Sequence, residues 1–234
     1  MYLGGYGLYI LFSLPALLFG LWAQLKVKSA FARYSKVGTT TGLTGAEVAR
    51  RMLDQNGLNG INIGETRGAL SDHYDPASKT LRLSSGVFHS SSVAAAGVAA
   101  HESGHAIQDL EKYSPLKIRS IMVPTVQLGS WLGPIVFMIG MFMASQTGTT
   151  IAWIGLFLFS ATAIFALITL PVEIDASNRA KAWLSDSGII YSSEVVGINK
   201  VLDAAALTYI AGAVQAITTV LYYAFLLTGR SRRD

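Results

Sequence analysis

Long uncharged stretches dominate the pattern of hydrophobic and polar positions along the chain. Residues 1–25 and residues 204–229 contain no charged side chain, and a third stretch of 53 residues runs from residue 120 to residue 172. A helix that crosses a bilayer needs about 20 mostly apolar residues, so the third stretch has room for two. A polar turn at residues 145–150 divides it.

The pattern therefore predicts four membrane helices. We expect them near residues 6–25, 122–144, 151–170 and 208–228. Prolines inside the second helix are compatible with this prediction, because neighbouring helices can satisfy the backbone groups that a proline leaves open.

The segments between the uncharged stretches carry shorter patterns. An alanine-rich run after serines 90–92 predicts a helix over residues 92–111. Thr44 and Glu47 have the spacing of a capping box at the start of another helix. Alternating segments at residues 69–74 and 81–83 flank a proline turn and predict an antiparallel hairpin.

A last helix is expected after the third uncharged stretch. Pro171 precedes it, Gly188 follows it, and residues 173–184 fill the interval. Proline at a helix start and glycine beyond its end are the usual arrangement.

Composition supports a membrane protein. Only 14% of the residues are charged, well below the soluble average of about 25%. If all four helices cross, residues 26–120 and 173–203 share one side and hold 15 of the 18 lysines and arginines. The positive-inside rule places that side in the cytoplasm, although the arginines at positions 230, 232 and 233 fall on the other side. We interpret the basic excess as membrane-proximal and expect no nucleic-acid partner.

The sequence His101-Glu102-Ser103-Gly104-His105 carries the candidate chemistry. On a helix, residues four apart lie on one face, so both imidazoles can reach one metal ion. The chain has no cysteine, so any zinc ion must be held by histidine or carboxylate side chains. Zinc lowers the pKa of a bound water, and the glutamate of this motif is a general base. The expected cofactor is one Zn²⁺ per chain, with Glu102 as the catalytic residue.

A catalytic zinc usually has a third protein ligand. Glu173 is the first charged residue after the third uncharged stretch, and a helical hairpin would return it close to His101 and His105. Asp175 and Asp109 are alternatives that the residues alone leave open.

The two segments together resemble a known family. His101 to His105, followed by Glu173-x-x-Ala176-Ser177-x-x-Ala180, is similar to the gluzincin membrane peptidases and more closely to the bacterial membrane-bound neutral zinc metallopeptidases. Further similar segments are residues 22–28, 72–76, 98–100 and 205–209. The resemblance implies that Glu173 is the third ligand. Ser177 departs from the gluzincin pattern, which has an aspartate there that orients a ligand histidine.

The expected fold is mainly α, α+β: a zincin-like catalytic domain with a small antiparallel hairpin or sheet, plus about four transmembrane helices. The predicted organisation is a first transmembrane helix (1–25), a catalytic part with the HExxH helix (26–120), a transmembrane hairpin (121–171), a catalytic part with the third-ligand helix (172–207), and a fourth transmembrane helix with a basic tail (208–234).

Three functions compete for this pattern. The first is a zinc endopeptidase of the bacterial cell membrane, with its site at the cytoplasmic surface and protein or peptide substrates near the lipid bilayer. The second is an intramembrane protease, which the short apolar run before His101 disfavours. The third is a metal-binding scaffold or transporter component, which would be expected to carry charges inside its spans.

Overall fold

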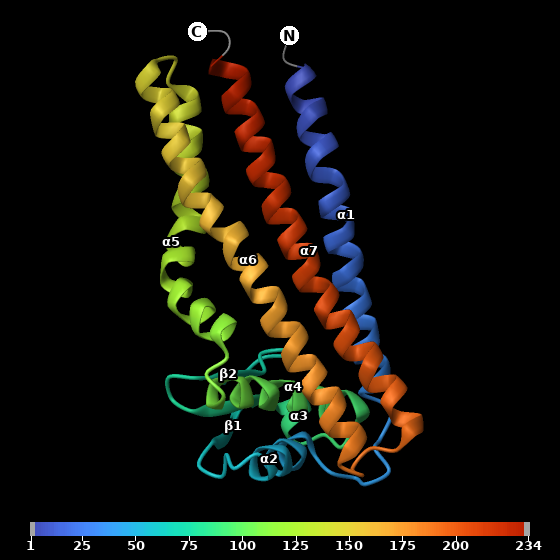
Figure 1. Ribbon diagram of the computed structural model, residues 1–234. Helices are drawn as coiled ribbons and strands as arrows, with labels where there is room; N and C mark the ends of the chain where they lie inside the picture. Colours follow the sequence, from blue (N-terminus) through green and yellow to red (C-terminus); the bar gives the residue numbers. More distant parts are fainter. Residues whose placement is uncertain (1–2, 232–234) are drawn as a thin grey trace. The chain divides into compact units, whose positions relative to one another are not determined.

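The computed structural model describes residues 3–231 and is mostly helical, with one small sheet (Figure 1). The predicted fold class is confirmed. The elements in chain order are α1 (Leu3–Tyr34), α2 (Gly45–Gln55), β1 (Asn62–Thr66), β2 (His73–Asp75), β3 (Thr80–Ser84), α3 (Ser85–Phe88), α4 (Val93–Leu110), α5 (Ser114–Phe142), α6 (Gln146–Asp186) and α7 (Ser192–Ser231). Positions 232–234 of the predicted basic tail lie outside the described residues.

The chain forms two compact units. One comprises residues 1–22, 118–170 and 209–234, and the other comprises residues 23–117 and 171–208. Within the described residues, four helices are long and apolar enough to cross a membrane, namely α1, α5, α6 and α7. The predicted number of membrane helices is therefore confirmed.

The first unit contains a tight helical hairpin built from α5 and α6. A Cβ added at Gly155 would lie 2.2 Å from the backbone nitrogen of Phe137, and one at Gly140 would lie 2.3 Å from that of Ala152. Glycine is therefore required for this approach of the two helices. The connection occupies residues 143–145, so the predicted turn at 145–150 was placed too late, because its threonines already belong to the first turns of α6.

The second unit has a three-stranded sheet in the order β1-β3-β2. The predicted hairpin is present, with Tyr74 opposite Leu81, but β2 begins only at His73, and residues 69–72 form a loop rather than a strand. Gly68 and Leu70 have positive φ angles of 102° and 57°, which interrupt an extended strand. β1 pairs with β3 in parallel, an arrangement that the sequence did not predict.

Two helices pack on this sheet to form the core. Thr44 caps α2, and the predicted capping box with Glu47 is confirmed in both directions. Buried apolar residues of α2 and α4 then close the interior between them: Ala49, Leu53, Ala95 and Ala99 with Leu81 and Leu83 of β3.

Helix α6 continues without interruption through Pro171. The prediction that a new helix starts after this proline was wrong. Ending a helix at an apolar boundary would leave several carbonyl groups open, whereas a proline inside it removes one hydrogen bond. Likewise α7 begins at Ser192, well before the predicted start of the last membrane helix at residue 208.

Candidate metal centre

Helix α4 presents both histidines of the motif on one face. Ser92 caps the helix by accepting a hydrogen bond from the backbone of Ala95, as the serine-rich start predicted. The rings of His101 and His105 lie 4.8 Å apart between centroids, at an interplanar angle of 82°. Four-residue spacing on a helix produces this approach.

Helix α6 carries Glu173 to the same point. Its backbone approaches α4 closely, since a Cβ added at Gly104 would lie only 2.8 Å from the carbonyl oxygen of Ala176. Gly104, one of the two variable positions of the motif, is thus needed for the contact between the two helices. The small side chain of Ala176, fully buried, allows the same approach from the other side.

The three predicted ligand residues meet in one cluster. Glu173 Oε2 lies 3.2 Å from His101 Nε2 and 3.6 Å from His105 Nε2, and all three ligand atoms lie within 4.8 Å of one another. Ligand atoms about 2.1 Å from a tetrahedral zinc stand roughly 3.4 Å apart. Two imidazoles and one carboxylate are also a known ligand set for catalytic zinc, so both the chemistry and the spacing fit this ion.

The cluster is largely withdrawn from solvent. Glu173 is 1% exposed and His105 is 7% exposed, and a carboxylate at such depth requires a compensating positive charge. Burial alone lowers the pKa of His105, but its hydrogen bond to Glu173 and the charges of Glu102 and Glu173 outweigh burial, so the pKa lies above its ordinary value.

Gln108 contacts Nδ1 of His105, the ring nitrogen that does not face Glu173. Nε2 of Gln108 donates to the carbonyl oxygen of Val172 and to Asp175, each at 2.8 Å. Both partners can only accept, so the amide oxygen of Gln108 must face His105 Nδ1, which lies 2.9 Å away. His105 therefore carries a proton on Nδ1, so Nε2 is the nitrogen available to bind a metal ion.

Sequence reasoning did not identify Gln108. The available signal was its spacing, because residue 108 lies three positions after His105 and seven after His101, on the same face of the helix. Polar residues on that face, fully buried in this case, are candidates to orient the ligands.

Ser177 contacts Nδ1 of His101, as Gln108 contacts Nδ1 of His105. Its Oγ lies 3.1 Å from His101 Nδ1, so the residue that replaces the aspartate of the gluzincin pattern still faces the ligand. A neutral hydroxyl is a weaker acceptor for the imidazole N–H than a carboxylate is.

The two alternative ligands, Asp109 and Asp175, form hydrogen bonds with other residues. Asp109 accepts hydrogen bonds from Tyr74 and Lys79, and burial together with this bond raises the pKa of Tyr74. Asp175 accepts from Gln108 and from Arg179. Neither belongs to the cluster of His101, His105 and Glu173, the group among residues 3–231 whose ligand atoms could hold a metal ion.

Glu102 follows His101 on α4 and is partly exposed. Its charge raises the pKa of His105. Its role as general base stays a prediction.

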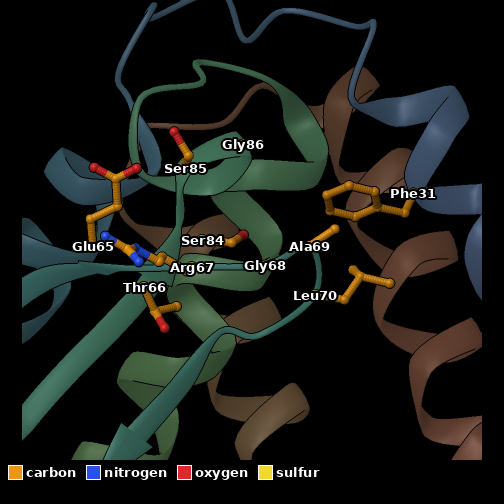
Figure 2. A pocket seen from close by; sticks show the side chains of 10 residues that line it. All are labelled: Phe31, Glu65, Thr66, Arg67, Gly68, Ala69, Leu70, Ser84, Ser85 and Gly86. Atoms are coloured by element: carbon orange, nitrogen blue, oxygen red, sulfur yellow. The ribbon is translucent and has the colours of Figure 1, made fainter.

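A cavity that the cluster does not line is present elsewhere in the second unit. That cavity, of about 630 Å³, lies between α1, the end of β1 and the loop that follows β1. Figure 2 shows Phe31 and Leu70 on one side of it and Glu65 on the other.

Comparisons with known proteins agree with the chemistry of the cluster. Residues 9–228 match the model of a family described as "Putative neutral zinc metallopeptidase". The chain is 45% identical over 224 residues to "Putative membrane protease YugP" of Bacillus subtilis (strain 168), covering 95% of this chain and 98% of that protein. No solved structure matches the chain.

Proposed function

Because this chain belongs to the neutral zinc metallopeptidase family, we propose that it is a membrane-integrated endopeptidase that hydrolyses peptide bonds at a zinc ion held by His101, His105 and Glu173. The observation that carries the proposal is the convergence of the three ligand atoms within 4.8 Å. Two of the ligands come from α4 and the third comes from α6, 68 residues beyond His105 in the sequence.

The reaction divides between the metal and the protein. When bound, zinc supplies Lewis-acid polarisation of the scissile carbonyl and lowers the pKa of water. Glu102 removes the proton from the attacking water and passes it to the leaving amine. Gln108 keeps His105 in the tautomer that leaves Nε2 open for the metal, and Ser177 contacts Nδ1 of His101 and so helps to orient that ring.

An extended substrate would bind along β2. This strand lies at one edge of the sheet, and an edge strand can pair with an added peptide through backbone hydrogen bonds. Tyr74 in the middle of β2 donates a 2.7 Å hydrogen bond to Asp109 of α4. The hydrogen bond fixes the strand to the helix that carries His101 and His105.

The reaction is proposed to occur at the cytoplasmic surface of the cell membrane. Glu173 directly follows the uncharged stretch of residues 120–172, so the cluster lies where the apolar part of α6 ends. The segments on that side hold 15 of the 18 lysines and arginines. Substrates would then be membrane proteins or proteins near the membrane.

A cleavage assay tests the function directly. The purified full chain is incubated with unfolded casein after metal removal, after zinc restoration, and after magnesium addition as the control. The proposal expects internal cleavage, read as new peptide termini by mass spectrometry, only in the zinc sample. A chain that takes up one zinc and leaves casein and membrane-protein substrates intact would favour the metal-binding scaffold instead.

A further inference from the structure

A second polar site lies between α1 and α7, on the side of those helices that belongs to the second unit. A cavity of about 370 Å³ opens there, lined by Lys26, Ser29, Ala30, Arg33, Tyr34, Lys200, Asp203 and Ala204. Its volume lies in the range of small-molecule sites. None of these residues belongs to the metal cluster.

The cavity is built by two matching helix faces. Lys26, Ala30 and Arg33 are spaced four and three residues apart, so they follow one face of α1. Lys200 and Ala204 have the same relation on α7. Tyr34 of α1 packs against α7, since a Cβ added at Gly197 of α7 would lie 2.7 Å from the Tyr34 ring.

A hydrogen-bonded connection near the cavity holds the two helices in register. Glu194, in the first turn of α7, accepts hydrogen bonds from the backbone of Thr40 at 2.6 Å and from its hydroxyl at 2.9 Å. Thr40 lies six residues beyond the end of α1. The walls of the cavity are thus positioned without any ligand.

The lining is positively charged. It contains three cations and one carboxylate, and that carboxylate, Asp203, is already paired with Lys181. Within residues 3–231, neither Arg33 nor Lys200 forms an ion pair, and the guanidinium of Arg33 lies 5.7 Å from the centre of the Tyr34 ring. Basic side chains, with the hydroxyl-bearing residues Ser29 and Tyr34 also in the lining, are suited to binding phosphate oxygens.

The position of the cavity along the helices favours a lipid as the source of a bound phosphate. Lys26 directly follows the uncharged residues 1–25, and Asp203 directly precedes the uncharged residues 204–229. Both helices therefore leave the apolar layer at this cavity. Arg33 lies about 10 Å further along α1 at 1.5 Å per residue, so the cavity spans the headgroup region, which is roughly 5–8 Å deep on each side of a bilayer, and extends slightly beyond it.

We propose that this cavity binds the phosphate of an anionic phospholipid headgroup. Basic pockets between membrane helices are suited to such headgroups. A zwitterionic headgroup would bring its own cation into the positively charged lining, so the site should prefer phosphatidylglycerol to phosphatidylcholine.

Native mass spectrometry of the full chain in detergent tests the proposal. Retained lipid is counted during titration with dioleoylphosphatidylglycerol or dioleoylphosphatidylcholine. At about fivefold in affinity per basic residue, the double variant Arg33→Gln/Lys200→Gln should bind phosphatidylglycerol roughly 30-fold more weakly than the wild type. The control Lys28→Gln/Lys36→Gln removes the same charge from exposed positions outside the cavity and should stay within about twofold of the wild type.

Three results would overturn the proposal. Equal losses in the two double variants would indicate diffuse attraction rather than a site. Equal retention of the two lipids by the wild type would remove the charge preference. Displacement of the lipid by millimolar inorganic phosphate would assign the site to free phosphate. Circular dichroism verifies folding, and the single variant Lys200→Glu, which should also lose the preference, replaces the double variant if that fails to fold.

Discussion

Gln108 fixes the tautomer of His105. The amide oxygen accepts the Nδ1 proton across 2.9 Å, while the amide nitrogen is held by Val172 and Asp175. The arrangement connects the helix of the histidines to the helix of Glu173 through one fully buried side chain.

Gln108→Ala should therefore weaken zinc binding. Loss of such an orienting partner typically costs about 10–100-fold in metal affinity, and we expect a loss in that range in a competition titration with a chelating dye. Gln24→Ala, at an exposed position of α1, is the control. An unchanged affinity in the Gln108 variant would mean that the hydrogen bond does not orient His105.

Ser177→Ala should have a smaller effect on the same titration, because a neutral hydroxyl contributes less than a charged acceptor. We expect a loss of a few-fold in zinc affinity. Ser177→Asp restores the residue of the gluzincin pattern and should bind zinc at least as tightly as the wild type. A Ser177→Ala loss that equals or exceeds the Gln108→Ala loss would contradict this ranking of the two partners.

Gly104→Ala should destabilise the contact between α4 and α6. The added Cβ would lie 2.8 Å from the carbonyl oxygen of Ala176, a backbone atom that cannot move alone. Overpacking of this kind costs about 1–3 kcal/mol, or roughly 2–4 °C in Tm per kcal/mol for a chain of this size. Gly212→Ala, with no atom within 4 Å of the added Cβ, is the matched control in thermal unfolding. Equal Tm values for the two variants would show that the helices can separate without cost.

Much of the site could be predicted from the sequence because its signals are local. The four-residue spacing of His101 and His105 requires only a helix, and the serine cap marks where that helix starts. Glu173 could be predicted as a ligand because an uncharged stretch of that length must form a hairpin, which returns the chain to the side it left.

The parts that could not be predicted depend on contacts between distant segments. β1 and β3 pair in parallel although a loop separates them in the sequence. Leu70 in that loop has a positive φ, which a leucine does not indicate in advance. The continuation of α6 through Pro171 reflects the apolar surroundings rather than the local preference of proline. The bond of Gln108 to Val172 joins residues 64 positions apart.

Glu173→Gln and Asp109→Asn test which of these two residues is the third ligand. Glu173→Gln keeps the shape of the side chain and removes its charge, so zinc affinity should fall by more than the roughly 100-fold expected for an orienting residue. Asp109→Asn changes a rival residue that is bonded to Tyr74 and Lys79, and zinc affinity should stay near the wild-type value. A reversal of these two results would assign the third ligand to Asp109.

The most direct test of the central claim is the rate of casein cleavage by Glu102→Gln, with the zinc content measured on the same sample. General base catalysis contributes about 10²–10⁴-fold, so we predict a rate lower by at least 100-fold while zinc stays near one ion per chain. Cleavage at the wild-type rate with zinc bound would contradict the role of Glu102 and the proposed peptidase mechanism.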